Sequence, residues 1–498
     1  MNEQHKKNFT LELKDLLSAQ SLASLRTIGR SIGLTSPTIL KKGELIDEII
    51  GVIVGDIPTQ ARSGRGAPVL NNSPDARILE EIERIKAKYS DHVLTPRDLE
   101  KIDYHLKERL DELRKEKNAF VLRSPEKFEF NEDGTPRVFK GQLATHKGVS
   151  FLLPLDYVND QEKMLLAVEF IRKYGLKEGD VIACNAKREG QIAVVTRIVE
   201  INGMSPEFFQ RGTNFEDANV RYPVGRIRVY DKERSPWLTA KYMDWVVPFG
   251  RGNRGLIIAP PKTGKTYFLE KVAAGAARLN DDVITLVLLV DQSPETIAQF
   301  RKIIAKDALI YSTYEDEPER QVFVADSILK RAKRLAECGR DVLLIVDSFN
   351  ALAHAYNDTE QSSGGKMLPC GLESKTINYI KKYFGSARCL AEGGSLTILG
   401  SVSNATGNPA DDVIASEVSS ASNLEIRLNE ELAIKRIFPA VDKNSVYVKF
   451  NDAEGYSEPE ALALLRRTGA THFNGVEMLS KLEKTATQQE FLEYLRKM

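Results

Sequence analysis

The sequence predicts a multi-domain protein with an N-terminal helical bundle, a small β-barrel and a C-terminal α/β core built on a parallel sheet. Apolar residues recur at helical spacing near the N-terminus, and short β-like runs broken by Gly, Asp and Asn fill the middle. In the C-terminal half, apolar strands alternate with longer helical segments. A chain of 498 residues also suits about three domains. We expect a helical module at 1–55, a flexible linker at 56–76, a charged helical segment at 77–127, the barrel at 128–231 and the α/β domain at 232–498.

The overall charge is balanced, with 70 Lys and Arg against 70 Asp and Glu. Any nucleic-acid site must therefore be a local basic patch or channel. The longest aliphatic runs, such as VITLVLLV, are far shorter than the ~20 residues of a membrane span, and the N-terminus lacks a signal-peptide pattern. The 4 cysteines are far apart without CxxC spacing. These features predict a cytoplasmic protein with reduced thiols and no membrane partner.

The N-terminal module shows helical spacing in LELKDLL, SLASLRTIGRSIGL and KKGELIDEIIGVI, with Ser21 as an N-cap and Gly33 as a helix stop. The next stretch is rich in Gly, Pro, Ser and Asn, which is typical of a linker. In the charged segment that follows, alternating Glu and Lys/Arg favour a solvated helix face over a basic RNA surface.

The middle region contains the strand-like runs RVFKGQLA, GVSFLLPL, GDVIACNA, QIAVVTRIVEI and GRIRVY. One helical run, EKMLLAVEFIRKYGL, interrupts them. Several short strands with one helix predict a barrel of the OB type.

A phosphate-binding loop is the sharpest signal in the chain. The strand GLIIAP leads into PKTGKT and then into an amphipathic helix, which is the context that such a loop requires. Backbone N–H groups of the loop can face phosphate oxygens, Lys265 can reach the β- and γ-phosphates, and Thr266 can bind Mg²⁺. Lys262 adds a second cation, while Ala259 stands where the usual first glycine would be. The alternative is a lysine-containing turn without a ligand.

In a second element, DVLLIVDS, a run of five aliphatic residues is followed by Asp347. A carboxylate at the tip of a buried strand can hold Mg²⁺ or its water shell, although a capping Asp would show the same pattern. The interval from Lys265 to Asp347 leaves room for two further strand–helix units. Together the two motifs predict a RecA-like P-loop ATPase core that binds ATP and Mg²⁺.

Beyond these motifs, the sequence resembles the Rho family of bacterial transcription termination factors nearly end to end. The matching strings are PFGRGNRGLIIAPPKTGKT, IYSTYEDEP, AKRLAECGRDVLLIVDS, YFGSARCLAEGGSLTI and NLEIRLNEELAIKRIFPAVD. The family also carries Ala-Pro-Pro-Lys, so Ala259 is a family trait. The helical N-terminus resembles the family's N-terminal bundle, and 128–231 resembles its cold-shock-like RNA-binding barrel.

The resemblance implies a homohexameric ring with ATP between subunits. Single-stranded RNA would pass through the centre, and 5′→3′ translocation would release it from RNA polymerase. It implies that Phe438 lies against the adenine and that Phe151 and Lys366 contact RNA. Lys265, Gln292 and Asp347 occupy the catalytic positions. The loop residues implied to bind the nucleotide are Pro261, Lys262, Thr263, Gly264, Lys265, Thr266 and Tyr267.

Several catalytic positions depart from the family pattern. Gln292 and Ser293 replace the family's Glu-Arg, and Gln292 can orient a water molecule but cannot take its proton. Ala351 and His354 replace two arginines, and His354 is more typical of a packed or capping histidine. No arginine matches the trans arginine finger; Lys449 is the nearest cation, and loss of a finger costs on the order of 10³-fold in rate.

The RNA-contact positions depart as well. Pro409 replaces the lysine of the second central loop, and GVSF replaces Gly-Phe-Gly-Phe, which leaves Phe151 as the matching aromatic. Three interpretations remain: an RNA-stimulated ATPase and translocase, a catalytically weakened nucleotide- and RNA-binding regulatory ring subunit, and a RecA-type motor of another function. The Rho-specific strings disfavour the third. The hydrolysis rate, the RNA preference and the composition of the ring are not fixed by the sequence.

Overall fold

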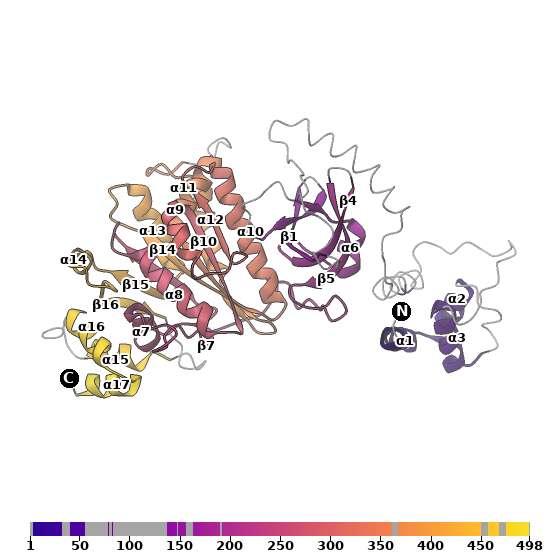
Figure 1. The fold of residues 1–498 in the computed structure, drawn as a ribbon. Coiled ribbons are helices and arrows are strands. Elements are labelled where there is room, and N and C mark those ends of the chain that lie inside the picture. The colour runs from indigo at the N-terminus through magenta and orange to yellow at the C-terminus, as the bar shows by residue number, and fades with distance from the viewer. Residues whose placement is uncertain are drawn as a thin grey trace. The chain divides into compact units, whose positions relative to one another are not determined.

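The computed structural model describes residues 3–31, 40–54, 137–146, 148–155, 163–189, 192–360, 367–449, 457–467 and 475–497, with 78 and 82 as well (Figure 1). The predicted linker at 56–76, nearly all of the predicted charged segment at 77–127, Gly33 and Lys366 lie outside the described residues. The predictions on those segments are therefore untested.

The described residues of the N-terminal part, 3–31 and 40–54, form three helices: α1 (Glu3–Ser18), α2 (Leu22–Ser31) and α3 (Lys42–Val54). The Ser21 hydroxyl accepts a hydrogen bond from the Ser24 N–H at 3.2 Å, which confirms the predicted N-cap of α2. The apolar faces of the three helices share one buried cluster, as helical spacing predicts. Its members include Leu13, Leu17, Leu25, Ile28, Leu45 and Ile49.

The middle of the chain folds into a closed five-stranded barrel with strand order β1-β2-β3-β5-β4. Its strands are β1 (Phe139–His146), β2 (Val149–Pro154), β3 (Met164–Leu165), β4 (Val181–Glu189) and β5 (Ile192–Ile201), and α6 (Val168–Tyr174) follows β3 in the chain. The predicted barrel is confirmed, with two corrections. The run EKMLLAVEFIRKYGL is not a single helix, because Met164–Leu165 form β3 and α6 begins at Val168. The run GRIRVY (225–230) adds no barrel strand, because β7 (Val224–Arg226), which overlaps it, pairs with β8 (Gly250–Arg251) outside the barrel.

The barrel strands contact the α/β domain through buried polar groups. The guanidinium of Arg211 pairs with the carboxylates of Asp180 and Glu337, both with fully buried side chains. The amide of Gln142 on β1 donates to the Ser327 carbonyl at 2.8 Å. Such paired groups fix one orientation, because an unpaired buried charge is strongly destabilising.

The α/β domain contains a nine-stranded sheet with the main order β11-β10-β12-β14-β9-β15-β16. Neighbouring strands from β11 to β15 run parallel, and β16 is antiparallel to β15. This is the predicted parallel sheet, and the apolar runs GLIIAP, VITLVLLV and DVLLIVDS lie in β9, β10 and β12. Its nine strands are β6 (Val220–Arg221), β9 (Arg254–Ala259), β10 (Val283–Gln292), β11 (Leu309–Thr313), β12 (Asp341–Asp347), β13 (Arg388–Leu390), β14 (Ser395–Ser403), β15 (Leu424–Leu428) and β16 (Val441–Val448).

Helices cover both faces of this sheet (Figure 1). They are α7 (Leu238–Trp245), α8 (Lys265–Leu279), α9 (Pro294–Phe300), α10 (Pro318–Glu337), α11 (Phe349–Glu360), α12 (Ser374–Gly385), α13 (Pro409–Ala421), α14 (Glu430–Ile434), α15 (Glu460–Arg467), α16 (Gly475–Lys484) and α17 (Gln488–Arg496).

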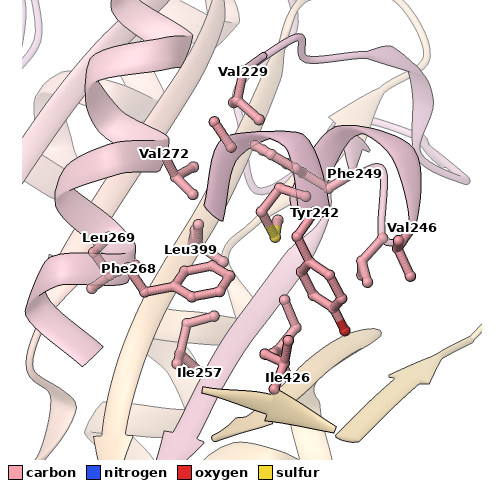
Figure 2. Packing of buried hydrophobic residues seen from close by; sticks show 14 of the residues in the cluster. Val229, Tyr242, Val246, Phe249, Ile257, Phe268, Leu269, Val272, Leu399 and Ile426 are labelled. Carbon is pink, nitrogen blue, oxygen red and sulfur yellow. The ribbon is translucent and has the colours of Figure 1, made fainter. Parts of the chain in front are cut away.

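Successive side chains of β12 point to opposite faces of the sheet. Leu343 and Ile345 belong to the cluster that includes α8, whereas Val342, Leu344 and Val346 belong to the cluster that includes α10 and α11. Figure 2 shows the first cluster, which contains Phe268 and Val272 of α8, and the Phe268 ring lies beside Ile257 of β9. Since side chains alternate with period two, Asp347 falls on the α8 side of the sheet.

Candidate nucleotide-binding site

The loop from β9 to α8 is shaped by two residues in the left-handed region, Lys262 at φ 63° and Gly264 at φ 93°. A Cβ on Gly264 would lie 2.8 Å from Cε1 of Phe438, so both the backbone and the contact require glycine. The Thr263 hydroxyl donates to the Pro260 carbonyl at 2.7 Å and holds the turn. Gly264 has no side chain that could cap α8. The first N–H groups of that helix are therefore available to donate hydrogen bonds to an anion.

Lys265 is the first residue of α8, and its ammonium lies beside the loop. Its Nζ donates to the carbonyl oxygens of Ala259 at 3.2 Å and Pro260 at 3.0 Å. Burial lowers the pKa of Lys265, and the nearby charge of Asp347 opposes that shift. A desolvated ammonium held between neutral carbonyls gains a stronger, charge-assisted partner when a phosphate oxygen is present.

Asp347 ends β12 and is only 2% exposed. Its Oδ2 accepts from the Thr266 hydroxyl at 2.7 Å, and its Oδ1 accepts from the Ser401 hydroxyl on β14. The structure therefore brings together the two predicted metal ligands, Thr266 and Asp347. A carboxylate and a hydroxyl are oxygen ligands of the kind that Mg²⁺ prefers, with water and phosphate completing the shell.

Gln292 lies at the end of β10, next to this cluster. Its Nε2 is 3.5 Å from the Asp347 carbonyl oxygen and 3.4 Å from the Val290 carbonyl oxygen. Ser293 caps α9, accepting from the Thr296 N–H at 3.2 Å. The departure at Ser293 thus has a structural role, and Gln292 is the residue of the pair that faces Asp347.

Phe438 and Tyr267 form an aromatic pair at the loop, with ring centroids 5.8 Å apart. Tyr267 is 41% exposed, and Lys271 Nζ lies 5.0 Å from its ring centroid. Because Phe438 also touches Gly264, its ring stands beside the phosphate loop, where a base attached to bound phosphates can reach it.

His354 is held by a carboxylate that joins α11 to α13. Its Nε2 is 2.9 Å from Asp411 Oδ1, and Asp411 also accepts from Asn350 Nδ2 and the Thr406 hydroxyl, each at 2.7 Å. Burial alone would raise the pKa of Asp411, but these three hydrogen bonds outweigh it, so that pKa lies below its ordinary value. The contacts fit the interpretation of His354 as a packed histidine.

Of the two residues predicted to contact RNA, Phe151 does not join this cluster, and Lys366 lies outside the described residues. Phe151 on β2 is 4% exposed, and Lys163 Nζ lies 5.5 Å from its ring centroid. That ring face is covered by a cation, so stacking of a base on Phe151 requires Lys163 to move. Pro409 opens α13 behind the N-cap Asn408.

Two residues of the site were missed by sequence reasoning, Ser401 and Asp411. Ser401 sits at the carboxyl end of an apolar run, which is the same signal that identified Asp347. Asp411 gave no such signal, because its contacts to Asn350 and Thr406 depend on how α13 packs against α11.

Comparison with known proteins agrees with this geometry. A model of the ATP synthase alpha/beta family, nucleotide-binding domain, matches residues 239–447. Transcription termination factor Rho of Karelsulcia muelleri is 32% identical over 354 residues, which is 68% of this chain and 91% of that one. The chain belongs to the Rho family of transcription termination factors. Rho of Escherichia coli strain K12 is 32% identical over 70% of this chain and 85% of its own length, and Rho of Streptomyces lividans is 33% identical over 74% and 53%.

As a member of the Rho family, the chain has a P-loop ATPase core. The third interpretation of the sequence, a RecA-type motor of another function, is therefore excluded. A solved structure of a prototypical ATPase from the type III secretion system of pathogenic bacteria aligns with 61% of this chain and 94% of its own, at 19% identity and a TM-score of 0.46. Within the described residues, no helix is both long and apolar enough to cross a membrane.

Proposed function

We propose that this chain is an ATP-dependent RNA translocase and helicase that acts as a transcription termination factor, binding nascent RNA and releasing it from RNA polymerase. The observation that carries the proposal is the 2.7 Å hydrogen bond between Thr266 and Asp347 beside the Lys265 ammonium. This hydrogen bond brings the proposed metal ligands next to the loop proposed to bind phosphate. The chain that carries them is a Rho-family member, and its match to the K. muelleri protein covers 68% of this chain.

The residues of the site fit ATP with Mg²⁺, which supplies a phosphoryl group activated for transfer to water. Lys265 and the first N–H groups of α8 neutralise and orient phosphate oxygens. Thr266 and Asp347 provide the metal ligands, and Ser401 fixes the carboxylate of Asp347. Gln292 can hold a water molecule in place by hydrogen bonds but cannot accept its proton, so hydrolysis is slower than with a glutamate.

The proposal extends to an assembly and its RNA. We infer a homohexameric ring with ATP between subunits and single-stranded RNA through the centre. Phe438 would contact the adenine, and Phe151 and Lys366 would contact RNA. The N-terminal helices would form the Rho-type bundle, and 128–231 would form the RNA-binding domain. Action on nascent transcripts places this function in the cytoplasm.

Steady-state ATP hydrolysis with and without poly(C) RNA tests the proposal. Wild type is expected to show RNA-stimulated turnover that Lys265→Ala abolishes and that Lys302→Ala, an exposed lysine outside the site, leaves intact. Absence of RNA-stimulated turnover above the Lys265→Ala background would overturn the translocase. If ATP binding persisted in that case, the function would be that of a regulatory nucleotide-binding ring subunit.

A further inference from the structure

Asn404 lies at the carboxyl edge of the sheet, one residue beyond the end of β14. Its backbone N–H donates to the carbonyl oxygen of Ala259 at 3.3 Å. The ammonium of Lys265 donates to the same oxygen at 3.2 Å. Asn404 is therefore next to the phosphate loop and close to the lysine that is proposed to bind the β- and γ-phosphates.

The strand order places Asn404 and Gln292 on the two sides of Asp347. β10 and β14 are the two neighbours of β12, and both run parallel to it. Gln292 ends β10 and Asn404 directly follows β14, so their backbones lie at the two strand ends that flank the end of β12. One amide-bearing residue thus stands on each side of the proposed metal ligand.

The backbone around Asn404 is held firmly in place. The Ser403 N–H donates to Asn350 Oδ1 at 2.6 Å, and Asn350 Nδ2 donates to the Ser403 carbonyl at 3.1 Å. On the other side, the Ala405 N–H donates to Asp412 Oδ1 at 2.8 Å. Ala405 has φ 51°, a left-handed conformation that a non-glycine residue keeps only where its surroundings impose it. The position of Asn404 is therefore fixed before any ligand binds.

The side chain of Asn404, by contrast, makes no hydrogen bond to any residue that the structure describes. Its Oδ1 is buried, while the residue as a whole is half-buried, so a ligand can approach the amide. A buried amide oxygen without a donor destabilises the folded chain, and native proteins seldom keep one without a function. The hydroxyl of Ser401, on the same strand, does have a partner, because it donates to Asp347.

We propose that the side-chain amide of Asn404 binds the terminal phosphate of ATP and so allows the site to distinguish ATP from ADP. This inference rests on the proposed ATP site. An asparagine amide carries two N–H donors and one acceptor oxygen. Nδ2 donates to an oxygen of the terminal phosphate, and the Lys265 ammonium, which shares the Ala259 oxygen, supplies a donor for Oδ1. ADP lacks that phosphate and leaves the amide without its partner.

Equilibrium binding of ATP and of ADP, each with Mg²⁺, to the full chain tests this proposal. Asn404→Leu keeps the size of the side chain and removes its hydrogen-bonding atoms. Asn378→Leu is the matched control, because it makes the same change at an exposed position of α12. In Asn404→Leu the Kd for ATP should rise about 10- to 100-fold, the effect of losing a hydrogen bond to a charged group, and the Kd for ADP less than about twofold. The control should match wild type for both nucleotides.

The Tm of the nucleotide-free protein separates a ligand contact from a structural role. Because Asn404→Leu removes a buried oxygen that has no donor, its Tm should equal or exceed that of wild type. A lower Tm, with the ATP and ADP affinities reduced by the same factor, would show that Asn404 supports the fold and would overturn the proposal.

A ratio of ADP to ATP Kd values that is the same in Asn404→Leu and wild type would also overturn the contact, while the ATP site itself would stand. Failure of wild type to bind ATP would instead refute the proposed function, and the Asn404 contact with it.

Discussion

Replacing Gln292 with glutamate is the substitution that tests the catalytic part of the site most sharply. Gln292 Nε2 lies 3.5 Å from the Asp347 carbonyl oxygen and 3.4 Å from the Val290 carbonyl oxygen. Its side chain therefore lies beside the backbone of Asp347, the residue proposed to bind the metal, where a general base can act on a water molecule near the terminal phosphate. Gln292→Glu keeps the length of the side chain and adds a proton acceptor.

The expected gain follows from two opposing effects. A positioned general base contributes about 10²- to 10⁴-fold in rate. Against this, the variant loses two long hydrogen bonds and brings a carboxylate toward two carbonyl oxygens, which together cost about 1 kcal/mol, or roughly fivefold. Turnover should therefore rise roughly 20- to 2,000-fold, while remaining low in absolute terms if no arginine finger acts.

The assay is steady-state release of phosphate at saturating ATP with poly(C) RNA. Gln299→Glu is the matched control, because it introduces the same charge on the exposed side of α9. A Gln292→Glu rate equal to that of wild type, with ATP affinity unchanged, would refute the placement of this side chain beside the reacting water.

Three further predictions follow from other parts of the structure. Phe438→Ala should weaken ATP binding about 5- to 150-fold, the equivalent of ~1–3 kcal/mol of base stacking, whereas the exposed Phe208→Ala should not; equal effects in a binding titration would contradict the adenine contact. Arg211→Ala should lower the free energy of unfolding by about 3 kcal/mol in urea, because it strips a cation from two buried carboxylates; a loss below about 1 kcal/mol would refute that role. Asp411→Asn should lower Tm at pH 7, and the difference in Tm between the variant and wild type should become smaller below about pH 4. The pKa of Asp411 is lowered in the folded protein, so its carboxylate stabilises the fold at pH values above the pKa of the unfolded chain. That stabilisation is lost as the pH falls through the pKa of the folded protein. A Tm difference that stays constant from pH 7 to pH 3 would contradict the Asp411 assignment.

The core of the site was predictable because it depends on short-range patterns. The aliphatic runs before Lys265 and Asp347 define two strands, and parallel strands bring their carboxyl ends to one edge of the sheet. The sequence therefore predicted that Thr266 and Asp347 would meet, and their hydroxyl and carboxylate oxygens lie 2.7 Å apart.

Contacts that depend on long-range packing were not predictable. Arg221, Arg254, Arg388 and Lys449 come from four segments but line one pocket, because β6 pairs with β13 and β16 runs antiparallel to β15. The local strand pattern also placed GRIRVY in the barrel, although β7 pairs with β8 instead. Nothing in a short run of residues specifies which sheet an isolated strand will join.

The most direct test is the Kd for ATP measured with and without Mg²⁺ in wild type, Asp347→Asn and Asp341→Asn, which lies at the other end of the same strand. If Thr266 and Asp347 hold the metal of a bound triphosphate, Mg²⁺ should tighten ATP binding at least about tenfold in wild type and in Asp341→Asn, and much less in Asp347→Asn. The same dependence on Mg²⁺ in all three proteins would contradict that assignment.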